Sequence, residues 1–459
     1  MTLDEKILEM KEDIIKSVQQ CVRIKSVENI NEGGTPFGIG VQEALEFCLK
    51  LSENFGFDVK NLDNKVGYAQ YGNGEEMIAI LGHLDVVPEG DGWTYNPYDA
   101  EIHNGKIYGR GTTDDKGPTV GAIYALKAIK DLNIPLKKRV RIIFGLNEET
   151  GSECVKHYID IGEEIPVAGF TPDAEYPIIN GEKGIVTCEY KKNINQKNAK
   201  VILKSINGGI APNVVPEYAK AEVVVDKDTI EKLKGIAQNI KEIEIEEKAE
   251  FIIIKSYGVS AHGSIPEKGK NAISHLLLFL ENINFDKDVQ EFIQFMNKYI
   301  GLNTTGEKLG IFLEDDISGK FVFNLGKIDG NEEEINVSIN MRYPVTKNYE
   351  DFKDIFELKM NEGNFIEVFT RHKKSIYISP ETDFIKKLQK VYEEKVGENA
   401  ELISIGGGTY AKSMPNIVAF GPIFKGQPMV EHKPDEYIDI NELIKNIQIM
   451  AAAICELCN

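Results

Sequence analysis

The pattern of apolar and polar positions predicts alternating helices and strands in the first third of the chain. Apolar residues recur at helical spacing from about 4 to 24, and a second helix is expected over 39 to 55. Two apolar runs of strand length, Met77–Val87 and Val140–Leu146, flank a helix expected over 118 to 132. Pro118 suits the first turn of that helix. Strands that alternate with helices favour an α/β core with a mainly parallel sheet.

The pattern of predicted elements changes after about residue 184. FVFNLGKIDG and EINVSINMRYPV predict a hairpin through Asn331–Glu334, and the alternation in NVSINMRY indicates a sheet with one face in water. Further strands and helices are expected in GIVTCEYKKN, YAKAEVVVD and KAEFIIIKSYG, and near 227–240 and 271–283. From about 380 the helix-then-strand rhythm returns. We therefore expect an α/β domain made of 1–183 and 380–459, with an α+β domain, 184–379, inserted into it.

Composition narrows the class of protein. The chain has 459 residues, and 53 Lys+Arg against 73 Asp+Glu give a net charge of −20, a poor match for nucleic acid or an anionic membrane surface. The start of the chain lacks a basic stretch followed by an apolar one, and no apolar run approaches the roughly 18 residues of a spanning helix. The six cysteines are scattered, as in reduced proteins. We expect a cytoplasmic protein of two or three domains.

Three short segments carry residues that suit a metal centre. His83 and Asp85 stand two apart at the end of a predicted strand, so both point the same way, and Asp85 can accept a hydrogen bond from a metal-bound His83. Asp114 lies in the glycine-rich GRGTTDDKGP, just before a predicted helix. Another strand ends in the adjacent carboxylates Glu148 and Glu149, which repel each other unless a cation or a proton intervenes.

Each segment alone is weak evidence, because a His-x-Asp pair is more often structural, a Glu-Glu pair is usually solvated surface, and glycine with aspartate usually marks a turn. Their order along the chain strengthens the case for a shared metal site. All three segments fall at predicted strand ends or loops, where open α/β sheets bind ligands.

Five motifs follow one another along the chain: GHLDVVPEGDGW, GRGTTDDKGP, NEETGS, TPDAEYPIINGEKG and EHKPDEYI. Together they resemble the di-zinc exopeptidase family of aminoacylases, carboxypeptidases and carnosinases, and within it the bacterial dipeptidase V branch. The likeness runs from about residue 10 to the end. It implies a phosphorylase/hydrolase-like α/β catalytic domain with an inserted, enlarged α+β lid domain.

The resemblance also implies the metal ligands. His83 and Asp173 would hold one zinc, Glu149 and His432 the other, and Asp114 would bridge them. Asp114 is preferred to its neighbour Asp115, because the family places the bridging carboxylate two positions before the lysine of the Lys-Gly pair. Five ligands with one shared leave two terminal ligands for each metal, which suits zinc, although oxygen and imidazole ligands also suit manganese or cobalt.

The family further implies the catalytic roles. Asp85 would orient His83, Glu148 would be the general base for a metal-bridging water, and His262 of the lid would stabilise the oxyanion. Arg342 would clamp the C-terminal carboxylate of the substrate. The sequence alone also allows His262 to be a surface histidine and Arg342 an exposed strand arginine. Weaker substrate-lining candidates are Asn213, Gly407, Gly408 and Thr409.

Two features favour unblocked dipeptides as substrates. Asp173 stands where carboxypeptidases and deacylases of the family usually carry Glu, and Asp there accompanies acceptance of a free α-amine. The enlarged inserted domain resembles two fused lids, which implies a closed cavity and a monomer. The alternatives are an N-acyl-amino-acid deacylase, or a catalytically silent peptide-binding relative. The complete ligand set and the intact Glu148 argue against the silent relative.

Overall fold

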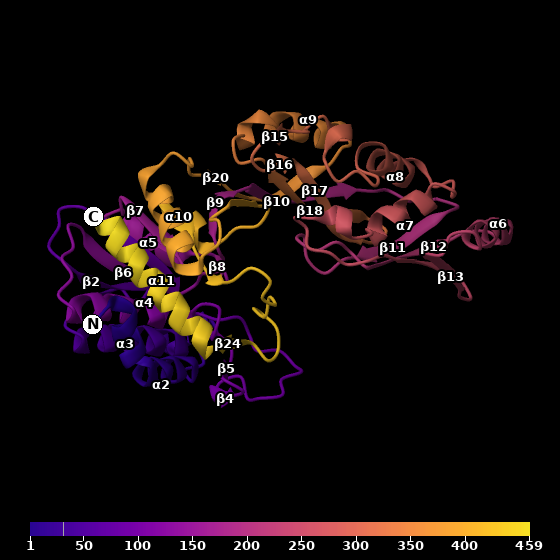
Figure 1. The fold of residues 1–459 in the computed structure, drawn as a ribbon. Coiled ribbons are helices and arrows are strands. Elements are labelled where there is room, and N and C mark those ends of the chain that lie inside the picture. The colour runs from indigo at the N-terminus through magenta and orange to yellow at the C-terminus, as the bar shows by residue number, and fades with distance from the viewer. Residues whose placement is uncertain (31) are drawn as a thin grey trace. The chain divides into compact units, whose positions relative to one another are not determined.

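The chain folds into two compact units. The structure, a computed structural model, describes residues 1–30 and 32–459. The first unit contains residues 1–180, 378–403 and 408–459, and the second contains residues 181–377 and 404–407 (Figure 1). Each unit has its own core of buried apolar side chains. Among the described residues, no helix has both the length and the apolar character needed to cross a membrane.

Most strands of a nine-stranded sheet belong to the first unit and form its centre. Its strand order is β1-β2-β6-β3-β7-β22-β9-β20, and β21 pairs with β9. Strand β3 runs parallel to both β6 and β7, and β22 runs parallel to β7, whereas β1 and β2 are antiparallel additions at one edge. The strands are β1 (Asp58–Leu62), β2 (Val66–Tyr71), β3 (Met77–His83), β6 (Arg139–Gly145), β7 (Ala168–Thr171), β9 (Ile178–Glu182), β20 (Ile376–Tyr377), β21 (Leu402–Ile405) and β22 (Ile417–Ala419).

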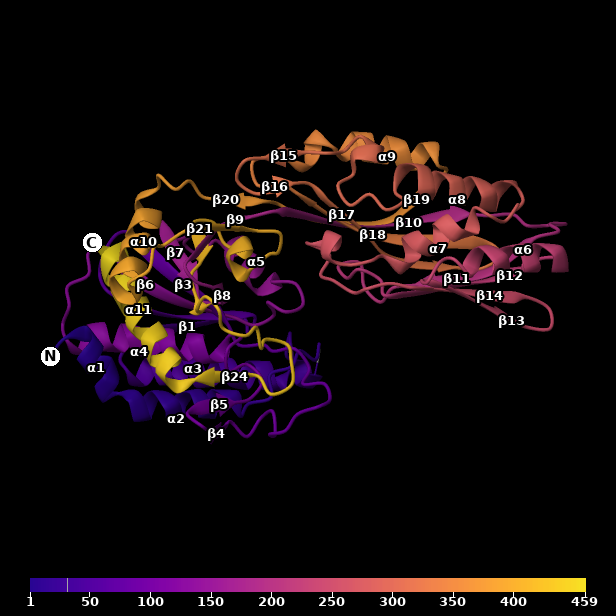
Figure 2. The same cartoon turned by 45° about the vertical axis from the view of Figure 1, so that its right-hand side comes forward.

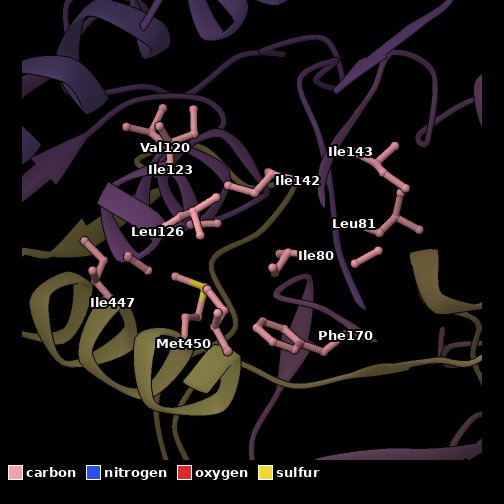
Figure 3. Close-up of a cluster of buried hydrophobic side chains, with 14 of the residues drawn as sticks. Ile80, Leu81, Val120, Ile123, Leu126, Ile142, Ile143, Phe170, Ile447 and Met450 are labelled. Carbon is pink, nitrogen blue, oxygen red and sulfur yellow. The ribbon is translucent and has the colours of Figure 1, made fainter. Parts of the chain in front are cut away.

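Helices cover both faces of this sheet because its central strands are apolar on both sides. Ile80 and Ile142 face α4 (Lys116–Asp131) and α11 (Ile440–Cys458), while Leu81 and Ile143 point to the opposite face (Figure 3). Helix α11, at the end of the chain, packs against α4 from its first third (Figure 1). The other helices of this unit are α1 (Leu3–Glu9), α2 (Lys11–Val22), α3 (Ile39–Asn54), α5 (Glu153–Asp160) and α10 (Asp383–Val396).

Small strands extend the first unit beyond the main sheet. A three-stranded sheet joins β4 (Glu101–His103), β5 (Lys106–Tyr108) and β24 (Tyr437–Asp439), and a parallel pair joins β8 (Ala174–Glu175) and β23 (Pro422–Ile423). These pairings tie the last part of the chain to its first half.

Two predicted elements differ from the structure, one by an interruption and one by its length. The helix expected from about 4 to 24 is interrupted at Met10, whose backbone leaves the helical region (φ −87°, ψ 4°), so that α1 and α2 are separate helices. The strand expected over Met77–Val87 ends at His83. Beyond it the backbone pairs elsewhere, since the Val86 N–H donates to the Ser26 carbonyl. An apolar run indicates that its residues are buried but does not show that they form a strand. Residues 84 and 86 are buried although they lie beyond the end of β3.

The second unit is an eight-stranded antiparallel sheet with helices on one face (Figure 2). Its order is β13-β14-β12-β11-β17-β18-β10-β19, and the predicted hairpin is confirmed, because Gly330 pairs with Ile335. The strands are β10 (Gly184–Asn193), β11 (Ile202–Gly208), β12 (Tyr218–Val224), β13 (Ile243–Glu247), β14 (Ile252–Tyr257), β17 (Val322–Gly330), β18 (Glu334–Tyr343) and β19 (Ile366–Lys373). The helices are α6 (Lys227–Ala237), α7 (Ala272–Leu280), α8 (Lys287–Tyr299) and α9 (Lys353–Glu362), and β15 (Glu314–Asp315) pairs with β16 (Gly319–Lys320).

The prediction of a water-facing side for β18 is wrong over most of the strand. Ser338, Asn340 and Arg342 alternate with apolar residues as expected, yet all three are buried. Arg342 donates to the carbonyl of Gly406, so the segment 404–407 covers this end of the sheet. The polar face of β18 is therefore lined with hydrogen-bonding groups that are buried and fixed in place.

Candidate metal centre

Three neighbouring parallel strands deliver acidic and imidazole side chains to one edge of the first unit. In the sheet, β3 lies between β6 and β7. His83 is the last residue of β3, Glu148 and Glu149 follow the end of β6, and Asp173 stands two residues after β7. The carboxyl ends of parallel strands share one edge of a sheet, so these side chains are brought together by topology.

Two more side chains reach the same edge from loops. Asp114 precedes α4, and His432 belongs to the segment between β23 and β24. Nε2 of His83 lies 2.9 Å from Oδ1 of Asp114, and Nε2 of His432 lies 3.0 Å from Oδ2 of the same carboxylate. Each oxygen of Asp114 therefore faces a different imidazole.

The remaining carboxylates divide between the two sides. Oδ1 of Asp173 is 3.8 Å from Nε2 of His83, and Oε2 of Glu149 is 3.1 Å from Nε2 of His432. Ligand atoms of His83, Asp114 and Glu149 lie within 4.8 Å of one another, and so do those of His83, Glu148 and Asp173. Imidazole nitrogens and carboxylate oxygens at this spacing could hold divalent cations, and the donor set fits zinc, manganese or cobalt.

Burial and mutual repulsion disfavour ionisation of several carboxylates in the cluster. Burial and then the charge of Asp173 raise the pKa of Glu148 well above its ordinary value, and burial with the charge of Asp114 raises the pKa of Asp173 to about 7. Hydrogen bonds to Asp114 and Glu149 raise the pKa of His432 to about 11. A nearby positive charge favours the ionised form of a buried carboxylate, and carboxylates with raised pKa values are typical of functional sites.

Asp85 contacts more of the centre than the sequence suggests. The nearest partner of His83 Nδ1 is the backbone oxygen of Asp85, at 3.0 Å, while the Asp85 carboxylate lies 3.5 Å away. The two carboxylate oxygens accept the backbone N–H groups of Glu148 and Glu149, each at 3.1 Å. Asp85 thus links the end of β3 to the Glu-Glu turn after β6.

Asp115, the neighbour of Asp114, points away from the cluster. Its Oδ2 accepts the backbone N–H of His83 at 3.1 Å and the hydroxyl of Thr119 at 2.9 Å. Burial raises its pKa well above the ordinary value. Asp115 therefore braces His83 and α4 from within the core.

Sequence reasoning missed Tyr410, whose ring packs against the imidazole of His83. Its ring meets the imidazole edge-on, with centroids 5.8 Å apart, and its hydroxyl lies 3.0 Å from Sγ of Cys154. Tyr410 is fully buried, and an added Cβ on Gly145 would fall 1.7 Å from its hydroxyl oxygen. The motif GGGTYAK contains this tyrosine, but no local pattern reveals its contact with His83.

The other predicted residues belong mostly to the second unit, which has its own polar cluster. His262 is exposed, and its Nδ1 lies 2.6 Å from the hydroxyl of Ser264. Partial desolvation of the imidazole, and next the charge of Arg342, lower the pKa of His262. Asn213 is also exposed, and its carbonyl accepts the Gly263 N–H at 2.7 Å. His262 and Asn213 therefore lie on adjoining loops.

Buried residues fix these loops. The amide of Asn324, another residue that sequence reasoning missed, donates to the carbonyls of Pro212 and Val214, on either side of Asn213. Arg342 donates through Nε to Oδ1 of Asn340 at 3.1 Å as well as to Gly406. Burial lowers the pKa of Arg342 to about 10, which leaves it a cation at neutral pH.

A second glycine-rich segment, residues 406–409, divides between the units. Gly407 belongs to the second unit, whereas Gly408 and Thr409 belong to the first. Thr409 begins a short 3₁₀ turn, and its hydroxyl accepts the Ala411 N–H at 3.2 Å. An added Cβ on Gly407 would meet only ordinary contact, at 3.6 Å, while one on Gly406 would lie 2.9 Å from Ser264. Close approach therefore requires glycine at 406.

A family model described as "Peptidase family M20/M25/M40" matches residues 79–456. The chain belongs to this family. It is accordingly a metallopeptidase, a hydrolase, and the match spans the segments that carry all six side chains of the cluster.

Relatives and solved structures match this chain over nearly its whole length. "Putative dipeptidase YtjP" of Bacillus subtilis (strain 168) is 41% identical, covering 100% of both chains, and a "Putative dipeptidase" of Staphylococcus epidermidis is 34% identical over 99% of each. Human carnosine dipeptidase 1 has a similar fold, with a TM-score of 0.58 and 15% identity over 99% of this chain and 98% of the other. Aminoacylhistidine dipeptidase from Vibrio alginolyticus gives 0.59 and 14%, over 96% and 95%. The α/β fold class with an inserted lid domain is thereby confirmed.

Proposed function

We propose that this protein is a metal-dependent dipeptidase that hydrolyses unblocked dipeptides. The observation that carries the proposal is the position of Asp114, with one oxygen toward His83 and the other toward His432. A carboxylate shared in this way suits a bridge between two cations. The names of the full-length relatives support a dipeptide substrate.

In this proposal each cation has two ligands of its own and shares a third. His83 and Asp173 would hold one, Glu149 and His432 the other, and Asp114 would bind both; zinc is the proposed metal, with manganese or cobalt as alternatives. Such a pair of cations lowers the pKa of a bound water and polarises the carbonyl that is attacked.

Glu148 is the proposed general base. Its carboxylate would take a proton from the attacking water and deliver it to the leaving amine. Burial supports this role, since it raises the pKa of Glu148 and makes the carboxylate a better proton acceptor. The backbone contact with Asp85 would hold Glu148 in place.

Two side chains of the inserted unit are proposed to act on the substrate. His262 would donate to the tetrahedral oxygen, a contribution that is typically worth about 2.7–4 kcal/mol for such donors. Arg342 would bind the substrate's C-terminal carboxylate, for which its planar guanidinium and its fixed position beside Asn340 are suited. Asn213, Gly407, Gly408 and Thr409 are proposed to line the substrate.

Replacement of Glu148 tests the mechanism. Glu148→Gln should lower kcat by at least about 10²-fold, because general acid–base catalysis typically contributes that much, while metal content stays near two ions per chain. Elemental analysis and initial rates on an Ala-Ala-type dipeptide provide the two measurements. Glu153→Gln, in the first turn of α5, is a matched control and should keep wild-type turnover. Wild-type turnover in Glu148→Gln would exclude this residue as the base.

A substrate comparison separates the proposal from its alternatives. We expect turnover of dipeptides with a free amine and little of N-acetyl amino acids, and inactivation by a chelator followed by recovery with zinc, manganese or cobalt. Preference for the acylated compounds would instead establish a deacylase, and no turnover of either would favour a silent relative. We also propose a cytoplasmic monomer, which size-exclusion chromatography checks against the mass of one chain.

A further inference from the structure

A buried ion pair outside the proposed ligand set lies directly behind the Asp114 loop. The side chain of Glu436 is fully buried and that of Arg110 is 2% exposed, and Nη1 of Arg110 donates to Oε2 of Glu436 at 2.7 Å. The two residues are 326 positions apart in the chain. Arg110 belongs to the segment that leads to Asp114, and Glu436 follows His432 by four residues.

Glu436 fixes the backbone of the loop that presents Asp114. Its Oε1 accepts N–H groups from Gly111 and Thr113, each at 3.0 Å, and from Asp114 at 3.3 Å. Its backbone carbonyl accepts the N–H of Gly109 at 2.9 Å. One residue of the His432 segment therefore accepts four backbone N–H groups between 109 and 114, in addition to the Arg110 side chain.

Arg110 connects the same loop to the His432 segment a second time, and to the segment of Glu89. Nη1 also donates to the carbonyl of Lys433, and Nη2 to that of Glu89, both at 3.3 Å. The guanidinium lies over the ring of Trp93 at 5.2 Å. Lys433 directly follows His432, so the arginine holds the two segments that carry Asp114 and His432 at a set separation.

General stability does not explain this arrangement well. A buried ion pair loses so much hydration that apolar residues of similar volume often stabilise a fold equally, whereas the pair's fixed geometry has no apolar substitute. Here the pair binds backbone N–H groups at and beside Asp114, and the carbonyl of Lys433, which directly follows His432.

We propose that Glu436 and Arg110 are positioning residues that set the Asp114 loop against the His432 segment and thereby tune the affinity of the bridged metal pair. This inference rests on the proposed function, because it assigns the pair a role toward the proposed ligands. Residues that orient metal ligands without touching the metal typically change metal affinity by about 10–100-fold when they are replaced.

The test measures metal binding directly, with no substrate present. Full-length wild type and Glu436→Gln are titrated with zinc in competition with a chromophoric chelator, well below the unfolding temperature of each variant. We expect about 10–100-fold weaker binding in Glu436→Gln, and a lower kcat that excess zinc restores, with KM for dipeptides within about twofold of wild type.

The chain offers a matched control in another buried ion pair of the first unit. Nη1 of Arg141 lies 3.0 Å from Oε2 of Glu163, with side chains 5% and 12% exposed. Glu163→Gln should lower the urea midpoint and leave zinc affinity within about twofold of wild type. If both Gln variants lose zinc to the same degree, the effect is one of general stability and the proposal fails.

Arg110→Lys keeps the test decisive if Glu436→Gln does not fold. A lysine retains a cation beside Glu436 but cannot donate to Lys433 and Glu89 together, so we expect a smaller loss of zinc affinity, about threefold to tenfold. Wild-type affinity in every folded variant would overturn the positioning role alone. A wild-type chain that binds no metal would instead overturn the proposed function.

Discussion

At the scale of single residues, the centre depends on side chains that hold other groups in place. The Asp85 carboxylate accepts two consecutive backbone N–H groups, those of Glu148 and Glu149, while its own backbone oxygen faces His83. The carboxylate offers one oxygen to each of these two N–H groups. Asp85 therefore aligns a proposed ligand and the proposed base in one step.

Replacing Asp85 by Asn should expose this double role. The amide keeps one acceptor but turns its NH₂ toward a backbone N–H, so one of the two contacts is lost. We expect kcat to fall about 10–100-fold, with a smaller fall in metal content, measured by initial rates and elemental analysis. Asp63→Asn, which alters a 2.9 Å surface contact with His157, is the control. Unchanged kcat in Asp85→Asn would contradict the alignment of Glu148.

At the scale of elements, the ends of three parallel strands create the centre. Strands β6, β3 and β7 are short and buried, and the chain leaves the sheet directly after each one. The fit of these ends against their neighbours is close. Gly145 ends β6 beneath Tyr410, which in turn contacts His83.

Gly145→Ala should disturb both the fold and the site. The added methyl would overlap the Tyr410 hydroxyl, and overpacking of this kind typically costs about 1–3 kcal/mol of unfolding free energy. Urea unfolding measures that loss, and zinc titration should show weaker binding because the turn at Glu148 follows directly. Gly235→Ala in α6, where nothing lies within 4 Å of the new methyl, should instead stabilise the protein by up to about 1 kcal/mol. Equal midpoints for the two variants would contradict the close fit.

At the scale of the whole molecule, the two units have separate apolar cores, and the proposed metal ligands all lie in the first. That unit is assembled from three stretches of chain, so His83 and His432 come from its first and last stretches. Binding of cations to both would add a cross-link between the chain's two halves. Its removal should therefore affect stability as well as activity.

Metal removal should lower the unfolding temperature, and more so at high pH. In the metal-free fold the pKa of Asp173 is raised to about 7, so its unfavourable contribution grows from about pH 4 to 7. The pKa of His432 is raised to about 11, so its favourable contribution is complete below pH 6.5 and is lost as pH rises toward 11. Both changes destabilise the metal-free protein as pH rises.

Calorimetry of zinc-loaded and chelator-treated protein at pH 6 and pH 8.5 tests this sign. We expect the loaded form to unfold at the higher temperature at both pH values, with the larger gap at pH 8.5, because cations also bind deprotonated ligands better. A gap that narrows at pH 8.5 would show that these groups do not control the stability of the centre.

The sequence by itself determined the class of fold and most of its elements. Helical and strand periodicity is local, so the regions of α3, α4 and the hairpin of β17 and β18 could be predicted closely. The order of the motifs identified the family. The resemblance to that family then implied Asp173 and His432, whereas His83, Asp114, Glu148 and Glu149 were also indicated by their places at predicted strand ends and in a loop.

Only the tertiary structure decided what those residues touch. The break at Met10, the early end of β3 and the burial of Asn340 and Arg342 depend on partners remote in sequence. So do the contact of Tyr410 with His83, and that of Glu436 with the Asp114 loop. Periodicity reports whether a side chain is apolar, whereas burial and hydrogen bonding are properties of surfaces that form only when distant segments meet.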